Sequence, residues 1–169
     1  MKRAVIVFGL ILGVILCINM FVMVHQMYTN PEFKGNDVLG YTLMVVMFSM
    51  IFFGVRDFRN KHLGGVISFG KALTTGIWIA LLGCTLYVVV WLFYYYLFVP
   101  DFLDVYVTHV LSHTSDAELA SRTEQMNQFK SMYDSPLMVA VMTYLEVLPV
   151  GLIVALVSAL ILKRKVAKG

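Results

Sequence analysis

The chain has 169 residues, of which 60% are hydrophobic and only 14% carry a charged side chain. An ordinary soluble domain carries about 25% charged residues, so this composition argues against a soluble protein. The formal net charge of +3 is small, and it gives no reason to expect a nucleic-acid partner.

Four apolar stretches are long enough to cross a lipid bilayer. A membrane-spanning helix needs about 20 apolar residues, because the hydrocarbon core is about 30 Å thick and each residue rises about 1.5 Å. None of the four contains Lys or Arg, and only the last contains an acid, Glu146. They cover residues 4–28, 38–55, 72–99 and 137–162. The sequence therefore predicts an all-α polytopic membrane protein, a single domain built on a four-helix transmembrane bundle.

The first stretch carries Gly9 and Gly13, four positions apart. Helices in lipid associate through close approach of their backbones, so small residues at this spacing predict a helix-packing face. We therefore expect Gly9 and Gly13 to face a neighbouring helix. The loop that follows, residues 29–37, contains Pro31 and Gly35, and it is predicted to be a tight turn before the second stretch.

The second loop, residues 56–71, contains Gly65-x4-Gly70-Lys71, which matches the first part of a phosphate-binding loop. Such a loop also needs a preceding strand and a following helix whose Ser or Thr holds magnesium. Here the next residue is Ala72, and no strand-helix unit fits into a loop of this length. We therefore expect no bound nucleotide and no other cofactor, and we interpret Lys71 as an anchor at the membrane interface.

The third stretch has a face of small residues, Ala72, Gly76 and Ala80, which predicts a second helix-packing surface. Its far end is rich in aromatic residues, from Trp91 to Phe98. Aromatic side chains are enriched at the boundary between membrane and water, so we expect an aromatic belt there. A surface on which a ligand stacks is the alternative interpretation of these rings.

The third loop, residues 100–135, is the only sizeable segment outside the predicted spans, and its apolar residues recur at helical spacing. Ser115 and Glu118 form a capping-box pattern, which predicts the start of a second amphipathic helix in this loop. His109 and His113 would share one helix face and could bind a metal together with Asp104 or Asp116, so they are weak candidates for a metal site. Because the pair lacks the Glu of the zinc-protease pattern, we favour a solvated helix face.

The fourth stretch carries a third small-residue face, formed by Gly151, Ala155 and Ala159. It also contains Glu146, three residues before Pro149. A carboxylate inside a bilayer is costly, so by default it faces a partner or a water-filled cavity. Proline removes a backbone donor from the helix, and Pro149 is therefore predicted to break the helix close to Glu146.

The loops are sorted by charge. Ten of the thirteen Lys and Arg residues lie at the N-terminus, in the loop 56–71 or in the C-terminal tail, whereas eight of the ten acids lie in the loops 29–37 and 100–135. Cytoplasmic loops carry the excess of Lys and Arg, so both termini are predicted to be cytoplasmic. The basic ends also suit the anionic headgroups of the lipid bilayer, the partner that this composition implies.

Polar side chains in all four spans fall at one depth. Each lies 15 to 17 residues from the basic residue that anchors the cytoplasmic end of its span, or about 22 to 26 Å of helix. These residues are Asn19, Tyr41, Tyr87 and Glu146. We predict that they form one polar layer in the outer third of the bilayer, with the first three as hydrogen-bonding partners of Glu146. The layer could fix the register of the helices or bind a proton or cation, and the third alternative is that Glu146 reaches water.

Five blocks of sequence, in this order along the chain, resemble an uncharacterised family of four-span inner-membrane proteins common in Bacteroidota, domain of unknown function 4199. The blocks are Gly40-Tyr-Thr42, Leu63-Gly-Gly-Val-Ile-Ser-Phe-Gly-Lys71, Met126-x2-Phe129-Lys-x-Met132-Tyr133-x2-Pro136, Glu146-x2-Pro149-Val-Gly151 and Lys163-Arg-Lys165. The resemblance covers nearly the whole chain. It implies a bacterial inner membrane with the acidic loops in the periplasm, and it assigns no activity or residue role.

Two classes of function remain open. The first is a non-enzymatic structural or accessory membrane protein, which docks a membrane protein partner or a second copy of the chain. The second is a small transporter or channel that uses the polar layer around Glu146, although four short spans make a monomeric transporter a poor fit. An enzyme comes third, because no catalytic set of residues falls at one depth.

Overall fold

The computed structural model describes residues 1–30 and 37–164, and over these residues the chain is almost entirely helical. The predicted turn at residues 31–36 and the basic residues after residue 164 lie outside the described part. The helices are α1 (Lys2–Thr29), α2 (Asp37–Phe48), α3 (Met50–His62), α4 (Phe69–Leu97), α5 (Phe102–Ser112), α6 (Leu119–Ser131) and α7 (Pro136–Leu162). Four segments are long and apolar enough to cross a membrane: α1, α2 with α3, α4 and α7. The predicted all-α class with four such helices is confirmed.

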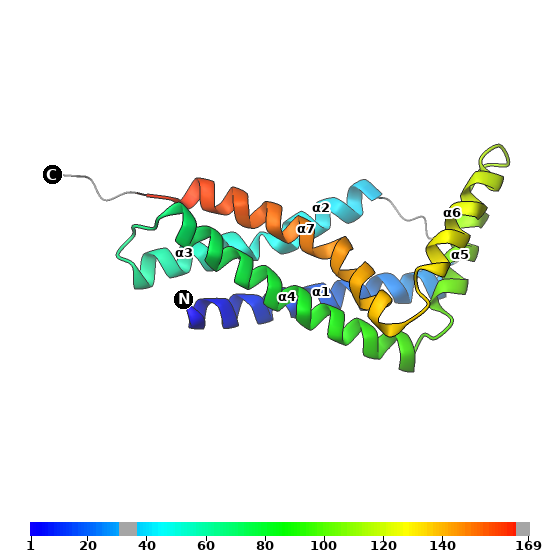
Figure 1. Ribbon diagram of the computed structural model, residues 1–169, viewed down its shortest axis with the longest axis horizontal. Coiled ribbons are helices and arrows are strands. Elements are labelled where there is room, and N and C mark those ends of the chain that lie inside the picture. The colour runs from blue at the N-terminus through cyan, green and yellow to red at the C-terminus, as the bar shows by residue number, and fades with distance from the viewer. Residues whose placement is uncertain (31–36, 165–169) are drawn as a thin grey trace.

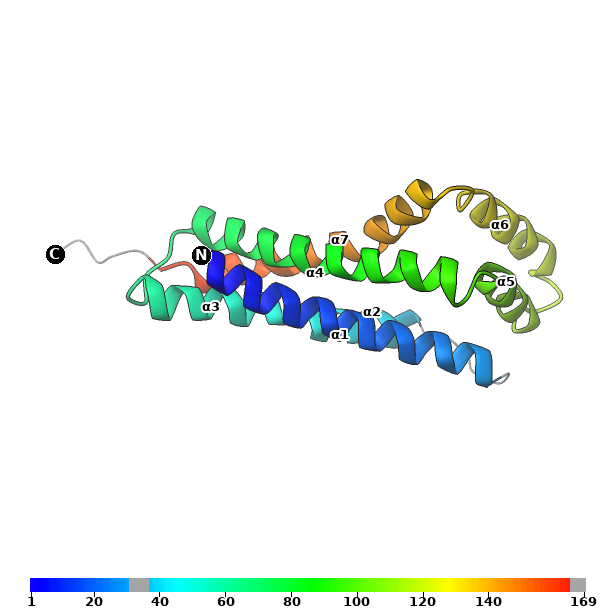
Figure 2. The same cartoon turned by 90° about the horizontal axis from the view of Figure 1, so that it is seen from below.

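The four long segments lie side by side and form an elongated bundle (Figures 1 and 2). α4 makes its most extensive contacts with α1 and α7, and therefore lies between them. α1 begins, α7 ends and α3 turns into α4 at one end of the bundle, which we call the terminal end. α5 and α6 form a hairpin, the cap, at the opposite end, which we call the capped end.

The core of the bundle is packed most tightly where α4 meets its neighbours. A Cβ atom at Gly76 would lie 2.9 Å from the Cβ atom of Ala155, and one at Gly9 would lie 2.8 Å from a methyl carbon of Leu82. Glycine at these positions lets α4 approach α7 and α1. The small residues of the three predicted packing faces are all buried: Gly9, Gly13, Ala72, Gly76, Ala80, Gly151, Ala155 and Ala159.

The second membrane segment is longer than predicted, and it is bent. The helix continues seven residues past Val55 to His62, and in this extension Asp57 and Lys61 pair one turn apart with an N–O distance of 2.6 Å. The bend lies at Ser49, between α2 and α3, where the hydroxyl group donates a 2.6 Å hydrogen bond to the carbonyl of Val46. A serine hydroxyl bonded to the preceding turn commonly bends a helix.

The turn between α3 and α4 is a compact link at the terminal end. Gly64 and Gly65 have φ angles of +62° and +87°, a conformation that glycine adopts without strain. Ser68 then caps α4 by accepting a 3.4 Å hydrogen bond from the backbone N–H of Lys71. The glycines that matched part of a phosphate-binding loop therefore form a turn and a helix start.

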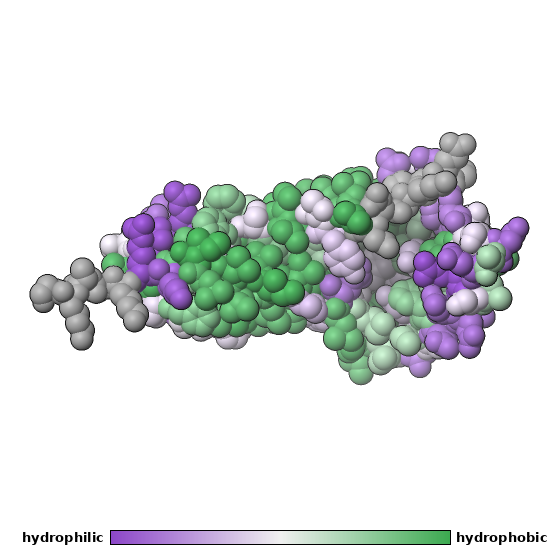
Figure 3. Space-filling model, turned by 90° about the horizontal axis from the view of Figure 1, so that it is seen from above, coloured by the Kyte–Doolittle hydropathy of each residue, from purple (hydrophilic) through white to green (hydrophobic). Residues whose placement is uncertain are grey.

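The surface divides into an apolar belt and two hydrophilic ends (Figure 3). Large apolar side chains project from the belt, including Val38 at 77% and Leu137 at 72% exposure. Exposed apolar surface of this extent suits contact with lipid. A small hydrophilic patch interrupts the belt towards the capped end, where α2 and α7 diverge (Figure 1).

Candidate functional site

A cavity of about 550 Å³ lies in the bundle at the capped end. It is bounded by α1, α2, α4 and α7 and is covered by residues of the cap. The lining is mostly apolar, with a few polar side chains among aromatic and sulfur-containing ones. Sites for small molecules usually have this character and volumes of about 300 to 1,000 Å³. We treat this cavity as the candidate site.

The four residues of the predicted polar layer all line this cavity: Asn19, Tyr41, Tyr87 and Glu146. They come from four different helical segments, and Tyr41 is 60% exposed at the edge of the space. Among the described residues, no hydrogen bond joins Glu146 directly to the other three. The structure thus arranges four polar groups around one open space, and direct bonding between them stays a prediction.

The helix that carries Glu146 is continuous. α7 runs from Pro136 to Leu162 with Pro149 inside it, so the predicted break at this proline is wrong. Proline removes only one N–H donor, and packing against neighbouring helices allows membrane helices to tolerate this loss. Ser135 caps the start of α7 by accepting a 3.4 Å hydrogen bond from the N–H of Met138. Glu146 is therefore held on a regular helix.

Aromatic rings form a connected arc above the cavity. Ring centroids lie 4.8 Å apart for Trp91 and Phe102, 6.0 Å for Phe102 and Tyr106, 5.8 Å for Tyr106 and Phe129, and 4.9 Å for Phe129 and Tyr133. All five rings line the cavity. We call them the aromatic arc. It joins α4 to both helices of the cap, so it positions the cap over the bundle.

Two polar contacts hold the cap in place. The hydroxyl of Tyr28 on α1 donates a 2.9 Å hydrogen bond to the carboxylate of Asp101, just before α5. Lys130 on α6 forms an ion pair with Asp104 on α5. The first contact ties the cap to the bundle, and the second joins the two cap helices to each other.

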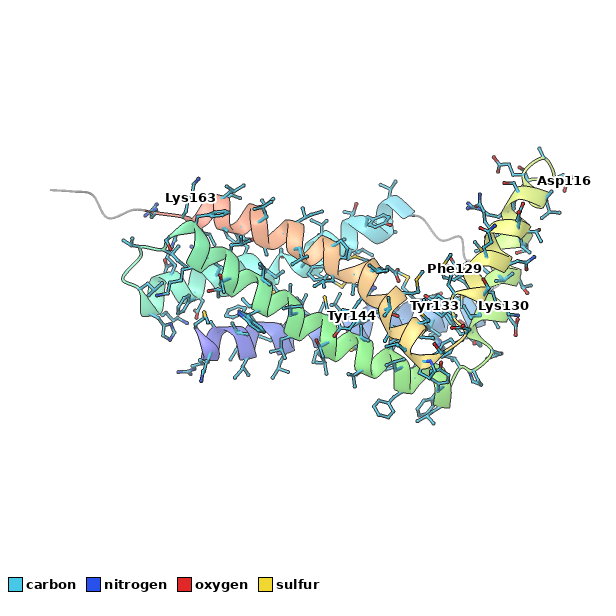
Figure 4. All side chains as sticks on the ribbon, viewed as in Figure 1. Asp116, Phe129, Lys130, Tyr133, Tyr144 and Lys163 are labelled. Atoms are coloured by element: carbon cyan, nitrogen blue, oxygen red, sulfur yellow. The ribbon has the colours of Figure 1, made fainter. Side chains whose placement is uncertain are left out.

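Tyr133 links the cap to the environment of Glu146. It follows α6 and lies beside the start of α7 (Figure 4), and it lines the cavity together with Glu146. Burial raises the pKa of Tyr133 above its ordinary value, and the negative charge of Glu146 raises it further. The phenol therefore stays protonated at neutral pH and provides a hydrogen-bond donor at the cavity wall.

The cap histidines lie side by side away from this lining. Their ring centroids are 4.7 Å apart, and Nδ1 of His113 lies 2.9 Å from the backbone carbonyl oxygen of His109. In residues 1–30 and 37–164, no group of three His, Cys, Asp or Glu side chains comes together in a way that could hold a metal ion. The His109 and His113 pair therefore gains no third ligand of these types from the described chain.

The predicted capping box is not formed. Ser115 donates a 3.4 Å hydrogen bond to the carboxylate of Glu118, whereas a capping box would have bonds from each side chain to a backbone N–H. The intervening residues form a turn, and α6 begins at Leu119. The segment is therefore a turn that precedes the helix.

Two features of the lining did not emerge from the sequence. The sequence predicts Trp91 in an aromatic belt, but its side chain is only 6% exposed and lines the cavity, whereas Phe93 and Phe98 are exposed, as expected of a belt. Five methionines also line the cavity: Met20, Met23 and Met27 on α1, and Met44 and Met47 on α2. We call them the methionine wall. Their spacings of three, four and seven residues are the signal that places each set on one helix face.

Comparison with known proteins gives one family. The model of a family described as "Protein of unknown function (DUF4199)" matches residues 7–164, which include most of α1 and all of the later helices. No curated protein and no solved structure matches the chain. Any role for the cavity therefore has to be argued from its own geometry.

Proposed function

The chain belongs to the DUF4199 family of proteins of unknown function, and we propose that it is a non-enzymatic accessory protein of the bacterial inner membrane that binds a ligand in its cavity. The observation that carries this proposal is that the cavity ends inside the bundle. Leu16 and Val147 line its inner wall, and next to them Leu12 and Phe48 are fully buried in the core. A blind cavity suits binding at one side of the membrane.

Charge supports an orientation with the cavity towards the periplasm. Lys163 lies at the terminal end and Asp116 lies at the tip of the cap, at opposite ends of the molecule (Figure 4). Arg56 and Arg59 are on α3, next to the terminal turn. Because Lys and Arg concentrate on the cytoplasmic side of membrane proteins, the terminal end faces the cytoplasm and the cap faces the periplasm.

The lining supports binding over catalysis. Among the described lining residues, Glu146 is the only carboxylate, and no His, Lys, Cys or Ser side chain accompanies it. General acid–base catalysis usually needs two titratable groups with different tasks at one site. The phenol of Tyr133 in the aromatic arc stays protonated at neutral pH, because burial raises its pKa, and it can donate a hydrogen bond. A single charged anchor in an apolar space is an arrangement that recognises a ligand.

A small transporter is the second candidate, and the position of Glu146 is the observation that favours it. Carboxylates within membrane segments often mark the path of an ion or a substrate. A transporter would have to open the packed half of the bundle, where Ile51, Val55 and Ile79 are fully buried. The two candidates therefore differ in whether this half ever becomes accessible from the cytoplasm.

Thiol labelling tests the blind cavity. In a background with Cys17→Ala and Cys84→Ala, we expect Met44→Cys to react with a charged, membrane-impermeant methanethiosulfonate added from the periplasmic side only. The control is Cys17→Ala alone, which keeps the fully buried Cys84 as its one thiol. Cys84 is expected to react from neither side. Its modification in inside-out vesicles would reject the blind cavity and favour the transporter.

A further inference from the structure

The cavity contains a carboxyl group, Glu146, that forms no ion pair with any basic side chain among the described residues. Among the described residues that line the cavity, there is no Asp, Lys, Arg or His, and Glu146 is the only Glu. At the capped end, Lys130 is paired with Asp104, and Arg122 donates a 3.1 Å hydrogen bond to Gln125. Neither Lys130 nor Arg122 lines the cavity. A carboxylate at this depth needs a cation or water as its partner, so an incoming cation would gain a strong contact.

The aromatic arc adds attraction for a positive charge. Aromatic rings attract cations placed within about 6 Å of the ring centroid, and the attraction grows as water is excluded. The arc brings five rings to the same cavity as Glu146, and successive centroids are at most 6.0 Å apart. A cationic group between the arc and Glu146 would therefore contact ring faces and a carboxylate at once.

The methionine wall provides room for an apolar group. Methionine side chains are flexible and polarisable, so they adapt their shape to apolar ligands. Five of them line the cavity, three from α1 and two from α2. The apolar part of a ligand would be removed from water there, which gains about 25 cal/mol for each Å² of apolar area.

These features select one class of ligand. We propose that the cavity binds a lipophilic organic cation, an alkylammonium whose charged group lies between Glu146 and the aromatic arc and whose alkyl group lies against the methionine wall. This inference rests on the proposed role as a binding protein and names the ligand of that same site. The volume of about 550 Å³ accommodates a molecule of this kind.

Other classes of ligand fit the lining less well. An inorganic divalent cation needs about six oxygen ligands, whereas Glu146 is the only carboxylate among the described lining residues. The hydroxyl of Thr143, the one aliphatic hydroxyl there, already donates a 2.7 Å hydrogen bond to the carbonyl of Val139. An anion would be repelled by Glu146, and a neutral lipid chain would leave the carboxylate without a partner. An organic cation uses the carboxylate, the rings and the methionines together.

Tryptophan fluorescence measures the binding directly. The chain has two tryptophans, Trp78 and Trp91, so Trp78→Phe leaves Trp91 in the aromatic arc as the only reporter. The full chain is placed in lipid nanodiscs and titrated with hexyltrimethylammonium. The neutral control is 1-nonanol, which has the same number of non-hydrogen atoms. We expect a saturable change with hexyltrimethylammonium and a much weaker response to 1-nonanol.

Two matched pairs of variants assign the binding to the site. Glu146→Gln keeps the shape of the side chain and is expected to weaken hexyltrimethylammonium binding at least about tenfold. Glu118→Gln removes the same charge at the exposed start of α6 and is expected to leave the affinity unchanged. Phe129→Leu removes one ring of the arc and is expected to weaken binding about threefold, whereas Phe98→Leu, at a side chain that is 72% exposed, has no effect.

Three results would overturn the proposed ligand class. They are an unchanged affinity in Glu146→Gln, equal responses to hexyltrimethylammonium and 1-nonanol, and no saturable response of Trp91. Each would leave the thiol-labelling result intact, so failure of the ligand class is distinguishable from failure of the blind cavity. If Glu146→Gln is lost from the membrane, the comparison of Phe129→Leu with Phe98→Leu decides in its place.

Discussion

The hydroxyl of Tyr144 on α7 donates a 2.8 Å hydrogen bond to the hydroxyl of Thr85 on α4, and so joins two helices within the membrane region. A hydrogen bond between membrane helices stabilises the folded state by about 0.6 kcal/mol on average. We expect Tyr144→Phe to lower the free energy of unfolding by about this amount. Reversible unfolding in mixed micelles, followed by circular dichroism, measures the change.

Thr85, which accepts this hydrogen bond, provides the control. Thr85 also donates a 2.7 Å hydrogen bond to the carbonyl of Leu81, so the effect of Thr85→Val alone includes loss of that bond. A double-mutant cycle with Tyr144→Phe and Thr85→Val isolates the contact between the helices. If the two changes were additive within error, the hydrogen bond would contribute nothing to the stability of the bundle.

The close contact between α4 and α7 at Gly76 predicts a larger effect. A Cβ atom at Gly76 would lie 2.9 Å from the Cβ atom and 3.3 Å from the Cα atom of Ala155, so α4 and α7 would have to separate. Overpacking of this kind typically costs about 1 to 3 kcal/mol, and we expect Gly76→Ala to destabilise the protein by that amount. The same unfolding measurement checks it.

Gly40 is the matched control for Gly76. It lies in α2, and a Cβ atom there would have no neighbour within 4 Å. We expect Gly40→Ala to be neutral or to stabilise the protein by up to about 1 kcal/mol, because alanine favours the helix. Equal effects of Gly76→Ala and Gly40→Ala would contradict the assignment of Gly76 to a close helix contact.

The fold and the positions of the polar residues were largely accessible from the sequence, because both follow from local regularities. Helix length and apolar composition gave the four spans, and the fixed rise of a helix gave the depth of the polar residues. Asn19, Tyr41, Tyr87 and Glu146 accordingly line the same space. Small residues four positions apart lie on one buried face because the helical repeat places them on the same side of the helix.

The cavity itself depends on how the helices are arranged relative to one another. Its width reflects the divergence of α2 and α7, and its roof depends on how the cap folds back over the bundle. Trp91 is an example. Its position along α4 is typical of an aromatic belt, but in the folded chain its ring packs against Phe102 and lines the cavity. The unbroken helix at Pro149 likewise depends on packing against neighbouring helices.

The ion pair between Lys130 and Asp104 predicts a local effect in the cap. Both side chains are more than half exposed, and ion pairs at exposed sites contribute about 1 kcal/mol or less. We expect Lys130→Gln to leave the unfolding of the bundle nearly unchanged and to speed amide hydrogen exchange in α5 and α6. Hydrogen-exchange mass spectrometry measures both regions in one experiment, with α4 as the internal reference. Faster exchange throughout α4 would show that the cap and the bundle unfold together.

The orientation of the bundle is tested by labelling its two ends. Asp116 is at the tip of the cap and Lys163 follows α7 at the terminal end. In the background without Cys17 and Cys84, we expect Asp116→Cys to react with an impermeant maleimide in intact spheroplasts, because the proposed orientation places the acidic cap in the periplasm. Lys163→Cys is expected to react only after the membrane is opened, because the same orientation places the basic terminal end in the cytoplasm. The reverse pattern would place the cavity on the cytoplasmic side, and it would mean that any organic cation reaches Glu146 from inside the cell.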